Sequence, residues 1–205
     1  MTTLYSLYGN PRHTMLVTGS GEVVYQVKSE HGVSSIMRAL PRKLGLEDEE
    51  QQFVVTGKLN WNRPITFQVG DSQPVPASKF LRVPISDSKF KQFMKMAEEH
   101  DKREFTSPSG NVYQWTLQGG DAKLRLKGTR DPIATYSMEQ GSLLGKDTRA
   151  ALFITPEGLE MLDLLVLTWV QVAMLINTFK SKGMFASIET EWALGSAGVD
   201  PGKDY

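Results

Sequence analysis

The run LDLLVLTWVQVAMLINTF, residues 162–179, is the most apolar stretch of the chain. As a helix its 18 residues would be about 27 Å long, whereas a membrane span needs about 20 predominantly apolar residues. Gln171 falls in the middle, where only another protein group could satisfy its amide. We therefore predict a helix buried in the core, with Gln171 hydrogen-bonded there, and keep a membrane anchor as the alternative. The predicted core positions are Leu162, Leu165, Trp169, Val172, Leu175 and Ile176.

The rest of the chain is typical of short β-strands. Runs of β-branched and aromatic residues are separated by glycine, proline and asparagine turns every 8–12 residues or so, a spacing that indicates an all-β sandwich or barrel. The predicted strands are Thr3–Tyr8, His13–Val17, Glu22–Val27, Gln52–Leu59, Pro64–Val69, Lys79–Ile85, Asn111–Leu117, Ala122–Lys127, Ile133–Met138, Gly141–Leu144 and Arg149–Thr155. Eleven or twelve strands closed into a barrel enclose more space than their own side chains fill. The predicted fold is therefore mainly β, a closed antiparallel barrel around the apolar helix.

The chain is expected to form one domain with an extension. Residues 1–180 are predicted to be a single barrel domain whose central helix spans about 157–180, and residues 181–205 form a C-terminal extension. A short amphipathic helix is predicted at 87–100, because Phe90, Phe93, Met94 and Ala97 follow helical spacing.

The composition suggests the compartment. The chain has 205 residues, no cysteine and no N-terminal signal pattern. We expect a cytoplasmic protein and leave peripheral attachment to membranes open.

Charge is balanced over the whole chain but uneven along it. Residues 57–130 contain 13 Lys or Arg and 7 Asp or Glu, a difference of +6. In Ala122–Lys127 the apolar and cationic residues alternate, which predicts a half-buried strand with its cations in water. A basic face would suit an anionic partner such as a phospholipid headgroup. The candidate lipid-binding residues are Lys123, Arg125, Lys127 and Arg130, followed by Lys79 and Arg82.

No catalytic or metal-binding pattern stands out. His13, His31 and His100 lie far apart, and the chain has neither a cysteine nor a G-x-S-x-G nucleophile motif. Tyr113 and Trp115 share one strand face, which suits a barrel core better than a base-stacking platform. We predict no catalytic residue, metal, cofactor or nucleic-acid partner, and lean against an enzyme.

One part of the chain resembles a known family. REFTSPSGNVYQWTL, Arg103–Leu117, resembles an element of an uncharacterised family of mushroom-forming basidiomycete fungi, as do Ile133–Ser137, Ala151–Gly158 and Leu162–Thr168. That family is similar to the tubby C-terminal-like superfamily, with the LURP-one-related proteins and phospholipid scramblases. The resemblance implies a closed barrel of about twelve strands around one hydrophobic C-terminal helix. Tubby domains bind membrane phosphoinositides through basic residues on the barrel surface, but those residues are not matched position by position in this chain. Scramblases carry a cysteine-rich segment that this chain lacks.

Three functional hypotheses remain open. The first is a non-enzymatic module that engages anionic phospholipid at a membrane surface through a basic barrel face. The second is a protein-interaction scaffold or homo-oligomer that uses an apolar patch within 184–194. The third is a small enzyme or a carrier of an apolar ligand, with space between barrel and helix near Trp169 and Met174.

Overall fold

Twelve strands and three helices make up the described part of the chain. The computed structural model describes residues 1–41, 50–84, 102–118, 120–138 and 149–181. The strands are β1 (Thr2–Ser6), β2 (Thr14–Val17), β3 (Val23–Glu30), β4 (Val33–Ala39), β5 (Phe53–Asn60), β6 (Thr66–Val69), β7 (Val75–Pro76), β8 (Lys102–Thr106), β9 (Val112–Gln118), β10 (Asp121–Leu126), β11 (Ala134–Ser137) and β12 (Ala151–Ile154). The helices are α1 (Ala77–Phe80), α3 (Pro156–Leu159) and α4 (Leu162–Ser181).

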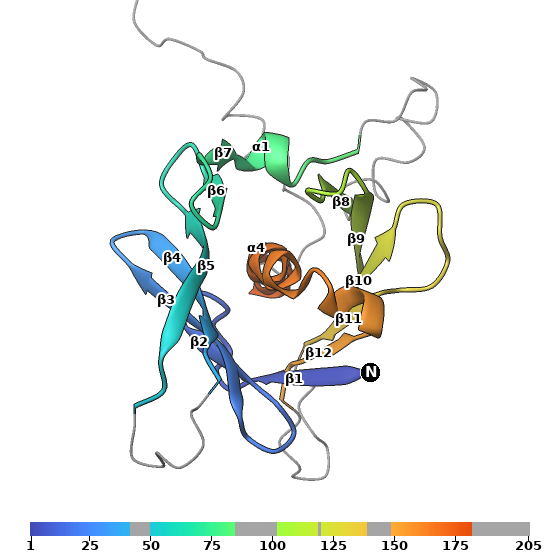
Figure 1. The fold of residues 1–205 in the computed structure, drawn as a ribbon. Helices are drawn as coiled ribbons and strands as arrows, with labels where there is room; N and C mark the ends of the chain where they lie inside the picture. Colours follow the sequence, from blue (N-terminus) through green and yellow to red (C-terminus); the bar gives the residue numbers. More distant parts are fainter. Residues whose placement is uncertain (42–49, 85–101, 119, 139–148, 182–205) are drawn as a thin grey trace, which may run out of the picture.

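All twelve strands belong to one antiparallel sheet. Their order is β7-β6-β5-β4-β3-β2-β1-β12-β11-β10-β9-β8, so β1 pairs with β12 and joins the two halves of the chain. The sheet curls around α4, which is seen nearly end-on at the centre of Figure 1. The prediction of a mainly β fold with about twelve strands is therefore confirmed.

The predicted closure into a barrel is wrong. β7 and β8 are the two edges of the sheet, and they do not pair with each other. β7 has only two residues, and Pro76 has no N–H to extend a ladder. The chain turns directly into α1, which lies at the gap between β7 and β8 in Figure 1. In the described residues, one isolated bridge between Arg82 and Glu104 crosses this gap. We call this region the seam.

The apolar helix is buried in the curl of the sheet. Three successive side chains show that α4 is surrounded. Leu167 lies against Gly57 of β5, where an added Cβ would come within 3.2 Å of the leucine methyl carbons. Thr168 Oγ1 accepts a 3.1 Å hydrogen bond from Trp115 Nε1 of β9. Trp169 packs edge-on against Tyr136 of β11, with ring centroids 5.7 Å apart. The helix is therefore core on at least three sides, as its composition predicts.

Gln171 does not behave as expected. Its side chain is buried, but its Oε1 has no hydrogen-bond partner among the described residues, and the same holds for Trp169 Nε1. The prediction that the core satisfies the Gln171 amide is therefore wrong for this oxygen.

Two local predictions also fail. The predicted strand Lys79–Ile85 begins inside α1, and its described residues, 79–84, make only the single bridge at Arg82. The helix predicted to start near residue 157 is divided into α3 and α4, because Pro156 and the Thr155 cap start a separate short turn. The cap is a hydrogen bond of 3.4 Å from Gly158 N to Thr155 Oγ1.

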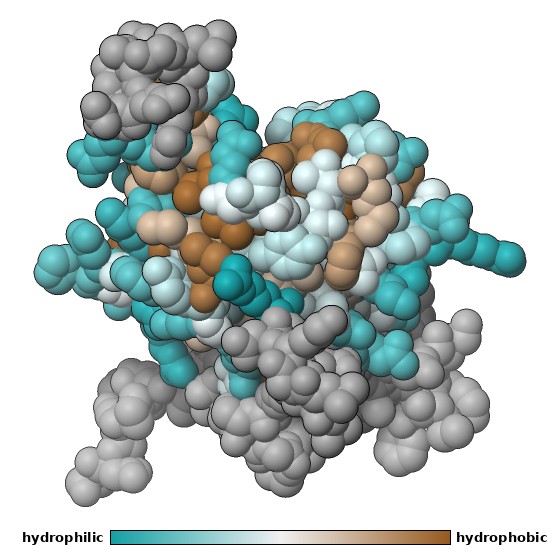
Figure 2. Space-filling model, turned by 90° about the horizontal axis from the view of Figure 1, so that it is seen from below, coloured by the Kyte–Doolittle hydropathy of each residue, from teal (hydrophilic) through white to brown (hydrophobic). Residues whose placement is uncertain are grey.

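Some predictions lie outside the described residues: the amphipathic helix at 87–100, the strand Gly141–Leu144, and the patch within 184–194. None of the helices in the described ranges combines the length and hydropathy that a membrane crossing requires. Figure 2, which views the molecule from the side of β1 in Figure 1, shows apolar side chains gathered among hydrophilic ones on the described surface.

Candidate anion-binding face

The outer face of β8, β9 and β10 carries a row of polar residues that strand register places side by side. Glu104 of β8 pairs with Gln114 of β9, which pairs with Arg125 of β10. The bridge at the seam adds Arg82 to the same row. Arg103 and Trp115, the neighbours of Glu104 and Gln114 along β8 and β9, are buried. Since successive side chains of a strand point to opposite faces, the row lies on the outside of the sheet.

A second row runs parallel to the first. Lys102 of β8 pairs with Thr116 of β9, which pairs with Lys123 of β10. The exposed turn that follows β10 contributes two more cations to this surface, Lys127 and Arg130. On the far side of the seam, Lys79 is exposed on α1, which packs against β8. We call this surface the basic face; its cations in the described residues are Lys79, Arg82, Lys102, Lys123, Arg125, Lys127 and Arg130.

The basic face has a positive balance. Against these seven cations stand Glu104, Asp121 and Asp131, so the described residues of the face carry a formal charge of 7 − 3 = +4. Lys123 makes no hydrogen bond or ion pair within the described ranges and is exposed. Arg125 donates a 2.9 Å hydrogen bond from Nε to the Arg130 carbonyl, which orients its guanidinium. Lys123 can therefore contact an anion without first breaking an ion pair within the described residues.

Glu104 is the acidic residue of the first row, and its carboxylate lies beneath two cations. Its side chain is 3% exposed, whereas those of Lys127 and Arg82 are 55% and 52% exposed. Lys127 Nζ lies 3.0 Å from Oε1, and Arg82 Nη2 lies 3.8 Å from Oε2. Gln114 Nε2 donates a 2.8 Å hydrogen bond to Oε1. Glu104 thus holds cations from both sides of the seam.

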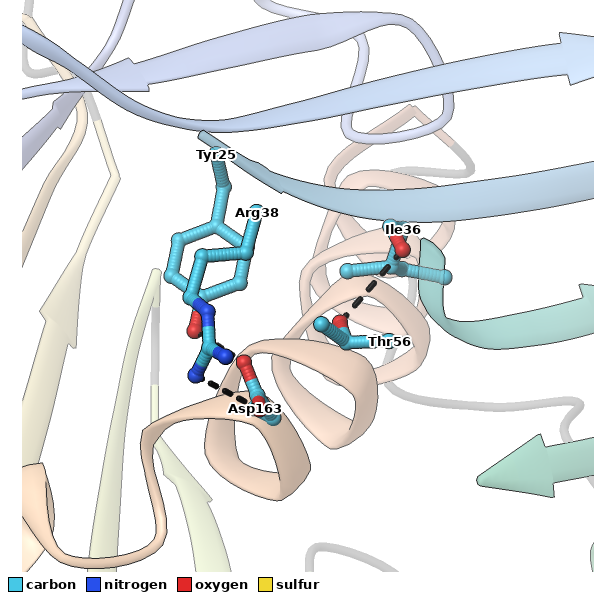
Figure 3. A network of polar contacts seen from close by, with 5 residues as sticks. All are labelled: Tyr25, Ile36, Arg38, Thr56 and Asp163. Atoms are coloured by element: carbon cyan, nitrogen blue, oxygen red, sulfur yellow. Dashed lines mark hydrogen bonds and ion pairs between the residues drawn. The ribbon is translucent and has the colours of Figure 1, made fainter. Parts of the chain in front are cut away.

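A second polar cluster ties the start of α4 to the sheet. Tyr25 of β3 and Arg38 of β4 are register partners, and both reach Asp163 in the first turn of the helix. The Tyr25 hydroxyl donates to Asp163 Oδ1, and Arg38 Nη1 lies 3.0 Å from Asp163 Oδ2. Figure 3 shows the three side chains pointing toward one another, beside the hydrogen bond from Thr56 Oγ1 to the Ile36 carbonyl. An acidic residue in the first turn also complements the helix dipole.

This cluster predicts a loss of stability at alkaline pH. Burial raises the pKa of the Tyr25 phenol well above its usual value, and the hydrogen bond to Asp163 raises it further. A group whose pKa is higher in the folded than in the unfolded state stabilises the fold fully below the unfolded pKa of about 10. That stability is lost as the pH rises above about 10, by about 1.4 kcal/mol per pH unit for one group.

Urea unfolding between about pH 8 and about pH 11 measures this loss. We expect the free energy of unfolding of Tyr25→Phe to fall less steeply above about pH 10 than that of the wild type. Tyr8→Phe, at a tyrosine that is 53% exposed, is the control and should keep the wild-type slope. Equal slopes for Tyr25→Phe and the wild type would show that the cluster does not control alkaline stability.

A comparison of the sequence with known protein families decides the classification. A sequence model of the Family of unknown function (DUF6593) matches residues 9–175. The chain belongs to this family. The match runs from before β2 into α4 and includes every cation of the basic face and both polar clusters. The expected membership in a family of unknown function is thereby confirmed. No curated protein and no solved structure matches the chain.

In this DUF6593 chain, the structure brings the sequence-predicted candidates together. Lys123, Arg125, Lys127 and Arg130 lie along β10 and its following turn, as the alternation indicates. Lys79 and Arg82 join them across the seam. The six predicted core positions all lie on α4. Trp115 is fully buried, and Tyr113 stacks on Phe105 at 5.6 Å, so this pair is core.

Sequence reasoning missed Lys102, Glu104, Tyr25 and Arg38. β8 and β4 were not predicted as strands, and without β8 the register that places Glu104 beneath two cations cannot be seen. The sequence of β4, VSSIMRA, does not alternate apolar and polar residues, so no local pattern indicates this strand. In the described ranges, no group of three or more histidine, cysteine, aspartate or glutamate side chains is placed to hold a metal ion.

Proposed function

We propose that this protein is a non-enzymatic module that binds anionic phospholipid at a membrane surface through the basic face. The observation that carries the proposal is the gathering of seven cations over β8–β10 and α1, with a formal charge of +4 on the described residues of the face. Basic residues close to an anionic membrane contribute about 1 kcal/mol each. A face of this charge is suited to headgroup phosphates and carboxylates.

The arrangement of the face supports the proposal. Lys123 and Arg125 project from one strand of a sheet that is anchored on α4, so the spacing of their backbone positions is fixed before binding. Arg125 is already oriented by the Arg130 carbonyl. We infer that the first contact is electrostatic, and that binding weakens as salt screens it.

Vesicle sedimentation tests this proposal. The wild type is expected to sediment with vesicles that contain phosphatidylserine or phosphoinositide, and to stay in the supernatant with phosphatidylcholine alone. The triple variant Lys123→Gln, Arg125→Gln, Arg130→Gln is expected to bind about a hundredfold more weakly, since three charges are removed.

The chain offers a matched control for this variant. Lys28 and Lys58 are exposed on β3 and β5, on the other side of α4 in Figure 1, and Arg63 is exposed after β5. The triple variant Lys28→Gln, Lys58→Gln, Arg63→Gln makes the same change in net charge and should bind like the wild type. Absence of wild-type binding to either anionic lipid at low salt would remove the proposal, and equal losses in both variants would remove the role of the basic face.

We also propose a distant relation between this family and the tubby C-terminal-like superfamily. Supporting it are twelve antiparallel strands that curl around one apolar helix near the end of the described chain. An experimental structure superimposed on proteins of that superfamily tests the relation. Matching strand order around the helix would support it, and a different strand order would reject it.

A further inference from the structure

Glu104 is a negative charge at the centre of a surface that is otherwise positive. Its carboxylate is almost completely buried, and half-exposed Lys127 and Arg82 lie over it. The two cations come from distant parts of the chain, one after β10 and the other after α1. Lys127 Nζ is 3.2 Å and Arg82 Nη2 is 3.8 Å from the same Oε2, so the two cationic groups are at most 3.2 + 3.8 = 7.0 Å apart.

The other hydrogen bonds of Glu104 keep the carboxylate in place. Gln114 Nε2 donates to Oε1 from the neighbouring strand. The backbone of Glu104 is paired with Arg82 in both directions, with N–O distances of 2.8 Å. Movement of the carboxylate away from a second anion would therefore break the hydrogen bond from Gln114 and the ion pairs with Lys127 and Arg82. An approaching phosphate must share these cations with a fixed negative charge that little water screens.

We propose that Glu104 is an internal counter-ion that limits the affinity of the basic face for lipid phosphate. This inference rests on the function proposed above and assigns Glu104 a role within it. Without lipid, Glu104 partly neutralises Lys127 and Arg82. With lipid, the headgroup phosphate competes with Glu104 for the same two cations. The unopposed contacts come from Lys123, Arg125 and Lys102, while Lys127 and Arg82 contribute less than their charges suggest.

Glu104→Gln tests this role directly. Glutamine preserves the size of the side chain and one acceptor for Gln114 Nε2, but removes the charge. We expect the variant to bind phosphatidylserine or phosphoinositide vesicles about fivefold more tightly than the wild type, the effect of about one elementary charge close to the membrane. Circular dichroism and a urea titration measure the folded fraction, so that vesicle affinity is compared per folded molecule.

Two further variants separate a local effect from a general one. Asp121 is a carboxylate of the same face whose Oδ1 accepts a 2.8 Å hydrogen bond from Ser137 and which forms no ion pair within the described residues. Asp121→Asn removes the same charge without releasing a cation, so it should tighten binding less than Glu104→Gln. In the Lys127→Gln background, Glu104→Gln should have a smaller effect than in the wild type, because the two residues act as a pair.

A comparison that leaves Glu104 intact covers the case in which Glu104→Gln does not fold. Lys127→Gln and Lys123→Gln each remove one exposed cation of the basic face. Lys127 is already opposed by Glu104, so Lys127→Gln should weaken vesicle binding less than Lys123→Gln. Equal losses in these two variants would overturn the counter-ion role.

The outcomes distinguish the two proposals. Wild-type binding with equal or weaker binding by Glu104→Gln overturns the counter-ion role alone and leaves Glu104 as a structural link across the seam. Binding by Glu104→Gln but not by the wild type would overturn lipid binding as the function of the natural chain, and would support only the effect of Glu104 on the affinity of the basic face. No binding by either folded protein overturns both proposals.

Discussion

Replacing Leu165 by lysine should leave the chain without a stable folded state. Leu165 is fully buried on α4, inside the curl of the sheet. A lysine there would lose the apolar contacts of the leucine and bury an ammonium group that has no partner. The effective penalty for one buried, unpaired ion is several kcal/mol, and loss of the packing adds about 2–5 kcal/mol. The sum approaches the whole stability of a typical domain, about 5–15 kcal/mol.

Leu159→Lys is the matched control for this substitution. Leu159 lies on α3, six residues earlier, and is 38% exposed, so the same lysine can reach water. Both variants are compared by circular dichroism and thermal unfolding. We expect Leu159→Lys to unfold cooperatively near the wild-type midpoint and Leu165→Lys to show no cooperative transition. A cooperative transition near the wild-type midpoint for Leu165→Lys, or a folded variant lacking residues 162–179, would contradict the role of α4 as the core.

Gly158→Ala is the second substitution with a large expected effect. Gly158 is buried in α3, at the point where the chain leaves β12 for the helices. An added Cβ would lie 2.6 Å from the Ile133 carbonyl oxygen and 2.7 Å from Ile154 Cγ2. The Ile133 carbonyl also accepts a 2.9 Å hydrogen bond from Thr155 N, so it cannot move without cost. Glycine is therefore required at position 158, because the backbone of α3 lies too close to the backbone of Ile133 to leave room for a Cβ.

We expect Gly158→Ala to lower the free energy of unfolding by about 2–3 kcal/mol, even though alanine favours helix by about 1 kcal/mol. Urea denaturation measures the difference. Gly9→Ala is the control, because an added Cβ at Gly9 meets no atom within 4 Å. A Gly158→Ala protein as stable as the wild type would show that α3 can shift away from β11 and β12 at little cost.

The sequence predicts the local features of this fold because they depend on neighbouring residues. In Ala122–Lys127, the alternation of apolar and cationic side chains predicts β10 and which of its residues face water. The apolar run beginning at Leu162 predicts a helix buried on several sides. In Lys79–Ile85 the same reasoning fails, because a four-residue helix and a single bridge leave no regular period to recognise.

The sequence by itself determined that the chain is mainly β, that its one long apolar helix is core, and that its middle is rich in cations. Only the tertiary structure decided that the sheet remains open between β7 and β8, and that Arg82, Glu104 and Lys127 meet there. The physical reason is the range of the interactions involved. Strand and helix periods arise from adjacent residues, whereas the meeting of these three side chains depends on the register of β8 to β10 and on the path of the chain after α1.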